Sequence, residues 1–150
     1  MLSNREVVEQ MYGALRQRDA DTMRALLHPD CVVRTAPGLP FAGGRITRGV
    51  DESLLGVWGT ISRHFDVVPT LETCLPTMDD TVVGVGTYEG TARATGQSFQ
   101  AWFVHLWTVS DGRIAGLRQV TDTVQWTNAL QPPQATPART AMDDERRRPR

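Results

Sequence analysis

The sequence predicts one α+β domain in which a curved antiparallel sheet wraps around three N-terminal helices. Two observations favour this fold class. Apolar residues recur at helical spacing through much of residues 4–65, whereas residues 66–122 form β-branched and aromatic segments separated by turn residues. Helices at one end of a chain and strands at the other are typical of α+β domains. Strong curvature of such a sheet leaves a cone-shaped cavity between the two layers.

Composition excludes several classes of function. The chain has 150 residues, enough for one real core, and its net charge of −1 argues against a dedicated nucleic-acid or membrane-surface protein. No apolar run approaches the ~20 residues needed to cross a bilayer, and the N-terminus shows no signal pattern. A cytoplasmic location is therefore expected. Cys31 and Cys74 are isolated and are expected to be buried small hydrophobes rather than a disulfide or metal pair.

Three helices are predicted in the first half. Ser3 and Glu6 form a capping box, so the first helix begins near Asn4. Asp19 or Asp21 caps a second, shorter helix, which Pro29 stops. The third helix spans residues 50–65, and a loop over residues 36–49 precedes it. A short strand over residues 31–35 lies between the second helix and this loop.

Strands dominate the second half. Residues 66–75 form a strand whose Pro69 suggests an edge position, and residues 81–92 form the next strand. Gly84 and Gly86 lie on one face of that strand with Tyr88, which would leave open space beside it.

The central feature is a hairpin over residues 98–122 with its turn at Asp111-Gly112. His105, Arg118 and Asp122 do not suit an ordinary apolar strand. An imidazole, a guanidinium and a carboxylate on adjacent strands can converge on one concave face, so these three residues are the catalytic candidates.

Two segments resemble a known superfamily. The stretch RDAD at residues 18–21, followed by LLHPD at residues 26–30, resembles the opening of nuclear-transport-factor-2-like domains. The stretch HLWTVSDGRIAGLRQVTDT at residues 105–123 is similar to their last hairpin, particularly in the SnoaL-like polyketide cyclase and ketosteroid-isomerase-like branch. The resemblance covers residues 7–130. It implies a conical, cystatin-like α+β barrel, a pocket between sheet and helices, and often a homodimer through the outer face of the sheet.

The resemblance also implies roles for single residues. Asp122 is similar to the late Asp that SnoaL-like cyclases use as acid/base in an intramolecular aldol closure. His105 falls on the strand acid of ketosteroid isomerases, and Tyr12 lies beside the position of their helical Tyr. Their catalytic base falls on Thr35, so steroid isomerisation is not expected. The Asp–Arg pair of limonene-epoxide-hydrolase-like members falls on the strand of Tyr88 and is absent, so that activity is not expected either.

The chemistry that these residues suggest is a cofactor-independent lyase or isomerase reaction. Asp122 in an apolar pocket would act as base, His105 would donate to the developing oxyanion, and Arg118 would orient Asp122 or a substrate oxygen. A structural alternative stays open: Asp122 caps a helical turn over residues 123–130, Arg118 pairs with Asp122, and His105 is a satisfied core residue.

Aromatic residues are expected to close the pocket around a small apolar or aromatic ligand, although each alone also suits core packing. These substrate-binding candidates are Tyr12, Trp58, Tyr88, Trp102 and Trp107. No metal-ligand spacing, phosphate loop or nucleophile elbow occurs, so neither a metal nor another cofactor is expected. The alternative function is a non-catalytic ligand-binding or dimerisation module, or a related hydroxylase or dehydratase.

Two further expectations concern assembly and domain limits. The outer sheet face, with Val83, Val85 and Phe103 or their opposite-parity neighbours, is expected to be covered by a second copy in a homodimer. The domain is expected to span residues 1–130, and residues 131–150, rich in Pro and Arg, are expected to form a disordered tail.

Overall fold

The computed structural model describes residues 1–133, so most of the expected tail (residues 134–150) lies outside the described residues. In chain order the elements are α1 (Asn4–Gln17), α2 (Ala20–Leu26), β1 (Leu27–Arg34), β2 (Ile46–Arg48), α3 (Val50–Ser53), η1 (Leu54–Gly59), α4 (Thr60–His64), β3 (Phe65–Pro76), β4 (Thr81–Ala92), β5 (Ser98–Ser110), β6 (Arg113–Thr121) and α5 (Thr123–Ala129).

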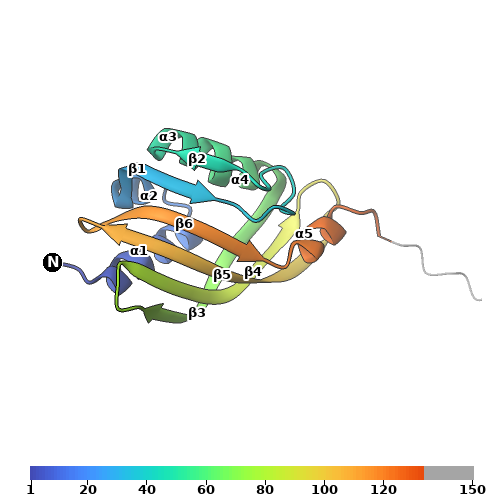
Figure 1. Cartoon of the computed structure of the whole chain (residues 1–150). Coiled ribbons are helices and arrows are strands. Elements are labelled where there is room, and N and C mark those ends of the chain that lie inside the picture. Colours follow the sequence, from blue (N-terminus) through green and yellow to red (C-terminus); the bar gives the residue numbers. More distant parts are fainter. Residues whose placement is uncertain (134–150) are drawn as a thin grey trace, which may run out of the picture.

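The predicted α+β class is confirmed. Six strands form one curved sheet in the order β2-β1-β6-β5-β4-β3, and β3 to β6 pair as the expected antiparallel meander. Figure 1 shows α1 and α2 near one end of these long strands and α5 near the other. The sheet differs from the prediction in two ways. Strand β1 joins it in parallel to β6, and the edge strands β2 and β3 do not pair with each other, so the sheet is not closed.

The helix boundaries follow from the local signals. Ser3 Oγ accepts a hydrogen bond from the Glu6 N–H at 3.2 Å, and Glu6 Oε2 accepts from the Ser3 N–H at 2.7 Å, which is the predicted capping box. Asp19 caps α2 through the Thr22 N–H at 3.0 Å. The third predicted helix is one continuous helical segment over α3, η1 and α4. Its centre, η1, is a π-helical turn, a widened conformation that is frequent beside functional sites.

Strand β5 sets the two faces of the sheet. Its odd-numbered residues from Phe99 to Val109 are buried toward the helices, whereas Trp102 and its even-numbered neighbours lie on the outer face. Phe103 is therefore an inward residue, 1% exposed, and its expected place on the outer face is wrong. It belongs to an aromatic core in which Tyr88 and Trp126 also pack.

The glycines of β4 do not leave open space. A Cβ on Gly84 would collide with the Tyr12 hydroxyl, and a Cβ on Gly86 would collide with the Thr70 carbonyl and with the ring of Phe103. These positions are small because a helix side chain and the neighbouring backbone already fill the space. The expectation of room beside β4 is therefore wrong: Gly84 lets Tyr12 of α1 approach the sheet, and Gly86 lets Thr70 and Phe103 approach β4.

This packing predicts the effect of Gly86→Ala. The added methyl group meets backbone that cannot rotate away, so the free energy of unfolding should fall by about 3 kcal/mol. Gly13→Ala is the matched control, because a Cβ on Gly13 meets no atom within 4 Å and alanine favours the helix by about 1 kcal/mol. Urea unfolding of both variants gives the two values. A Gly86→Ala protein as stable as the wild type would contradict the close approach of β3 and β4.

Candidate functional site

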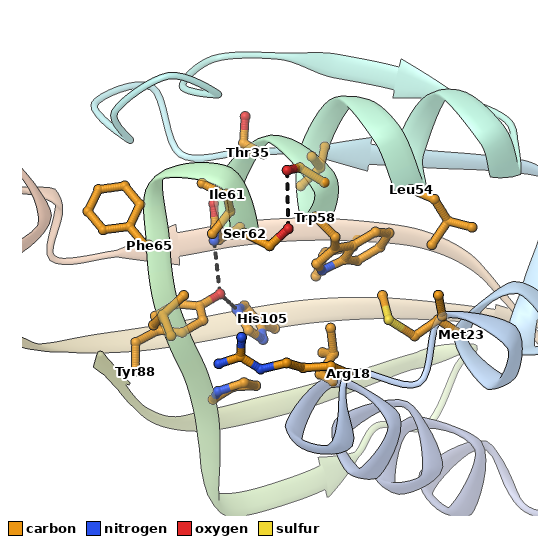
Figure 2. A pocket seen from close by; sticks show the side chains of 18 of the residues that line it. Arg18, Met23, Thr35, Leu54, Trp58, Ile61, Ser62, Phe65, Tyr88 and His105 are labelled. Atoms are coloured by element: carbon orange, nitrogen blue, oxygen red, sulfur yellow. Dashed lines mark hydrogen bonds between the residues drawn. The ribbon is translucent and has the colours of Figure 1, made fainter. Parts of the chain in front are cut away.

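A cavity of about 360 Å³ lies between the inward face of the sheet and the helices. Its walls are mostly apolar. The helical segments contribute Leu15, Met23, Leu54, Val57, Trp58 and Ile61, and the sheet contributes Phe65, Val67, Tyr88, Trp107 and Leu117. Figure 2 shows Trp58, Ile61 and Ser62 from the helical segment on one side of the cavity, facing Tyr88 and His105 on the other. The volume falls in the lower part of the range of small-molecule sites.

One chain of hydrogen bonds crosses the sheet wall of this cavity. Trp107 Nε1 donates to Tyr12 Oη at 2.9 Å, and Tyr12 Oη lies 2.7 Å from His105 Nδ1. On the other side of the ring, His105 Nε2 lies 2.7 Å from Tyr88 Oη, which also accepts from Gln119 Nε2 at 2.9 Å (Figure 2). His105 is 2% exposed and Tyr12 3% exposed, so this chain is sealed from bulk water except where it borders the cavity.

Counting donors and acceptors assigns the protons. Tyr12 Oη already accepts from Trp107, and within residues 1–133 the one acceptor for its own O–H is His105 Nδ1. A neutral imidazole that accepts at Nδ1 carries its proton on Nε2 and donates it to Tyr88. Tyr88 Oη then accepts from His105 and from Gln119, and its own O–H is left without a partner within residues 1–133. Because Tyr88 lines the cavity, that O–H is available to a ligand.

The opposite tautomer is disfavoured. Donation from Nδ1–H to Tyr12 would leave the Tyr12 O–H without an acceptor at a site that does not line the cavity. An unpaired buried donor costs about 1–3 kcal/mol. In the assigned tautomer the hydroxyl proton that has no partner within residues 1–133 is that of Tyr88, which instead faces the cavity.

Burial also keeps the titratable residues of this hydrogen-bond chain, His105, Tyr12 and Tyr88, uncharged. Desolvation lowers the pKa of His105 to about 3, so the ring carries no charge near neutral pH. The same effect raises the pKa of the Tyr12 and Tyr88 hydroxyls well above the ordinary value, against smaller opposing contributions from their hydrogen bonds. The site is therefore a neutral hydrogen-bond donor rather than an acid–base pair.

The structure does not assemble the proposed catalytic trio. Asp122 is exposed at the N-cap of α5, makes no side-chain cap hydrogen bond and does not line the cavity. Arg118 is exposed on the outer face beside Leu106, and the described residues give it no ion pair with Asp122. Only His105 of the three faces the cavity, and it has the hydrogen bonds that the structural alternative foresaw.

A β-bulge explains this difference. Across the two-residue turn, Val109 pairs with Ile114, and continuing that register would place Arg118 opposite His105. The register instead shifts by one residue between Thr108 and Val109, so that His105 pairs with Gln119. A shift of one residue exchanges the two faces of a strand. Gln119 thus turns inward, and Arg118 turns outward.

The remaining candidates divide between the two faces. Trp58, Tyr88 and Trp107 line the cavity, whereas Tyr12 lies behind His105 and does not line it. Trp102 is 68% exposed on the outer face, so its predicted place in the pocket is wrong. The same alternation that buries His105 turns Trp102 outward.

The lining residues that had not been foreseen include Arg18, Arg24 and Gln119. The inward position of Gln119 depends on the bulge in β6. The small residues Ala115 and Gly116 lie at this bulge, but they do not by themselves predict one. The position of Arg18 depends on a left-handed C-cap with φ 56°, a conformation that sequence patterns normally assign to glycine.

The described residues contain no group of three or more His, Cys, Asp or Glu side chains that could hold a metal ion. Within the same residues, no helix is long and apolar enough to cross a membrane.

Comparison with known proteins identifies the family. Residues 8–117 match the SnoaL-like domain, and the chain belongs to that family. It is similar to an NTF2-like protein from Burkholderia thailandensis, with 32% identity, a TM-score of 0.80 and coverage of 88% of this chain and 100% of that one. No curated protein matches the chain.

Two further structures share the fold. One is IdmH, a proposed polyketide cyclase from Streptomyces antibioticus, with 25% identity, a TM-score of 0.72 and coverage of 86% of this chain and 99% of that one. The other is TerC, crystallised with polyporic acid, with 24% identity, a TM-score of 0.75 and coverage of 84% of this chain and 96% of that one.

The proton assignment predicts the tautomer of His105. Nitrogen-15 spectra should show a neutral ring protonated at Nε2 from pH 8 down to pH 5, because its pKa is about 3. Tyr12→Phe removes the O–H that donates to Nδ1, so this variant should shift the ring toward the Nδ1–H form. A wild-type ring protonated at Nδ1 would contradict the assignment, and so would a ring that becomes charged above pH 5.

Proposed function

We propose that this protein is a cofactor-independent lyase or isomerase that acts on a small apolar or aromatic carbonyl compound, in the manner of a polyketide cyclase. The observation that carries the proposal is the position of Tyr88 Oη, which lies 2.7 Å from His105 Nε2 and 2.9 Å from Gln119 Nε2 and lines the cavity. By the proton assignment above, this oxygen accepts both hydrogen bonds and its own proton has no partner within residues 1–133. A carbonyl oxygen is the simplest acceptor for such a proton. The apolar walls around it suit an apolar or aromatic substrate body.

The chemistry that follows is stabilisation of an enolate. Tyr88 donates to the carbonyl oxygen and so acidifies the neighbouring C–H bond. When that bond breaks, the electron pair moves onto the oxygen, and the donated hydrogen bond strengthens. His105 Nε2–H and Gln119 Nε2–H both donate to Tyr88, which polarises its O–H further. The enolate then attacks a second carbonyl, as in an aldol closure, or takes up a proton at a new carbon, as in an isomerisation.

The base is not a carboxylate of the cavity. No Asp or Glu lies among the described residues that line it, and Nδ1 of His105 is occupied by Tyr12. The proton therefore leaves to water or to a basic oxygen of the substrate. Such a reaction depends on a substrate with acidic C–H bonds, for example one flanked by two carbonyl groups.

The comparisons support this class of substrate. IdmH, of the same fold and 25% identical, is itself a proposed polyketide cyclase. TerC was crystallised with polyporic acid, so a neighbour of this fold has been captured with a small organic acid.

A second candidate function is ligand binding without chemistry. The absence of a carboxylate from the described lining of the cavity favours it, because most enolising sites need a base. The same cavity would then hold the ligand through Tyr88 and the apolar walls alone.

Hydrogen–deuterium exchange at the α-carbon of 2-tetralone separates the two candidates. An enolising protein should accelerate exchange in D2O, measured by proton NMR, above the rate in buffer. Tyr88→Phe should lower that acceleration about a hundredfold or more, because one oxyanion donor is lost. Binding of 2-tetralone without any acceleration would reject catalysis of enolisation and support the binding module. Unfolding curves of Tyr88→Phe show whether any loss of exchange comes from loss of fold.

We also propose that the protein acts as a homodimer through the outer face of its sheet. Trp102 and Val120 there are 68% and 53% exposed, and Val83, Val104 and Leu106 surround them. Contiguous exposed apolar patches are typical of protein–protein interfaces.

The charges on this face suit a second copy of the same chain. Arg34, Arg48 and Arg118 gather toward β1, β2 and β6, and Glu89 lies toward the opposite edge on β4. A two-fold axis along the strands would bring the basic edge of one copy over the acidic edge of the other.

The dimer is testable with Trp102→Asp. A carboxylate in the middle of the apolar patch would be desolvated on association, so this variant should be monomeric where the wild type is dimeric. Light scattering at micromolar concentration measures the masses. Arg113→Asp, which changes an exposed residue at the hairpin turn, is the control and should leave the dimer intact. A monomeric wild type would reject the proposal.

A further inference from the structure

The formal charges that border the cavity are all positive in the described part of the chain. Arg18 and Arg24 line it, and no Asp or Glu does. The acidic partners of these arginines are Asp66 and Asp51, and neither of them lines the cavity. His105 is neutral, so it does not change this balance. A ligand in the cavity therefore meets positive charge at its edge and neutral donors at its wall.

Arg18 is placed there by an unusual backbone. It is the C-cap of α1, with φ 56° and ψ 38°, and its N–H donates to the carbonyls of Ala14 and Leu15. The left-handed conformation is unfavourable for a residue with a Cβ, and glycine is the usual choice at this position. Figure 2 shows the Arg18 side chain extending from this cap, and Arg18 lines the same cavity as His105 and Tyr88.

The guanidinium of Arg18 has N–H donors to spare among the described residues. Within residues 1–133 it makes one hydrogen bond, from Nη2 to Asp66, and a guanidinium has five N–H donors in all. The side chains of Arg18 and Asp66 are 49% and 56% exposed, so the ion pair between them is weak. Asp66 can hold one side of the guanidinium while the other side binds an anion.

The polar side chains around the cavity offer mainly donors. Within residues 1–133, neither the Tyr88 O–H nor the Trp58 Nε1–H has an acceptor, and both residues line the cavity. Two lining side-chain oxygens already accept a hydrogen bond: Gln119 Oε1 accepts from the Ala36 N–H at 3.2 Å, and Thr35 Oγ1 accepts from the Arg45 N–H at 3.0 Å. The Ser62 hydroxyl donates to the Gly59 carbonyl at 3.2 Å and keeps its lone pairs. With two arginines and two N–H or O–H donors without a partner in residues 1–133, the cavity favours a ligand that brings acceptors.

We propose that the ligand of this cavity is a flat, mostly apolar keto acid, with its carbonyl oxygen on Tyr88 and its carboxylate on Arg18. The inference rests on the proposed function for the carbonyl end and adds the anionic end. Arg18 is the specificity residue, since a planar guanidinium matches a carboxylate with two parallel hydrogen bonds. Arg24 adds positive charge at the same edge without being required for the contact.

The test compares two probes of nearly the same shape, 6-acetyl-2-naphthoate, which is an anion, and 6-acetyl-2-naphthamide, which is neutral. Calorimetric titration of the full-length protein at pH 7 and low salt should show the acid binding about tenfold or more tightly than the amide. Arg18→Gln should remove this difference by weakening the acid alone, and Arg18→Lys should restore part of it. Arg113→Gln, which removes an exposed arginine outside the cavity, should change neither affinity.

Three results would overturn the inference. They are equal affinity for the two probes in the wild type, a preference for the acid that survives in folded Arg18→Gln, and binding of neither probe at millimolar concentration. The outcomes also separate this inference from the proposed function. If both probes bind equally and Tyr88→Phe weakens both, the carbonyl site stands and only the anionic end is rejected. If Tyr88→Phe changes neither affinity while Arg18→Gln still weakens the acid, the carbonyl end is rejected and the anion site stands.

Discussion

The structure depends on one buried, neutral histidine that joins the helix layer to the sheet. Tyr12 reaches His105 from α1 because Gly84 of β4 has no side chain in its path. The ring then links α1 to β5, and Tyr88 and Gln119 extend the link to β4 and β6. Apolar packing alone would hold these layers together without fixing their positions, since it has no preferred direction. The hydrogen bonds fix the position of each ring, and through the rings they fix the shape of the cavity wall.

The burial of His105 lowers the free energy of unfolding in acid. Burial lowers the pKa of His105 to about 3 in the folded state, whereas an unfolded histidine has a pKa of about 6.5. Between these two values the unfolded chain binds a proton that the folded chain does not. The contribution of His105 to stability is therefore unaffected above about pH 6.5 and becomes increasingly unfavourable as the pH falls toward 3. The same burial that keeps His105 neutral near pH 7 therefore destabilises the folded protein in acid.

Local sequence signals predicted most of the fold. The capping box at Ser3, the Asp19 cap and the Asp-Gly turn each act over a few residues, so a single sequence reveals them. The parallel pairing of β1 with β6 joins segments about 85 residues apart, and no local pattern predicts it. The site was harder still. Of the residues expected to converge, His105 was placed correctly because β5 alternates regularly, and Arg118 was misplaced because a bulge in β6 has no distinctive sequence.

That bulge decides the chemistry of the cavity. Without it, the hairpin register would direct Arg118 to the face of His105, and Asp122 to the same face beside Ala101. With it, an amide from Gln119 meets Tyr88, and the carboxylate is left outside. The cavity wall loses a guanidinium and a carboxylate and gains a second donor to the Tyr88 oxygen, and the Tyr88 proton has no partner within residues 1–133. An oxygen that already accepts two hydrogen bonds releases its own proton more readily toward a ligand. One extra residue in a strand thus exchanges two charged groups on the cavity face for a neutral amide, which is the arrangement on which the proposed stabilisation of an enolate rests.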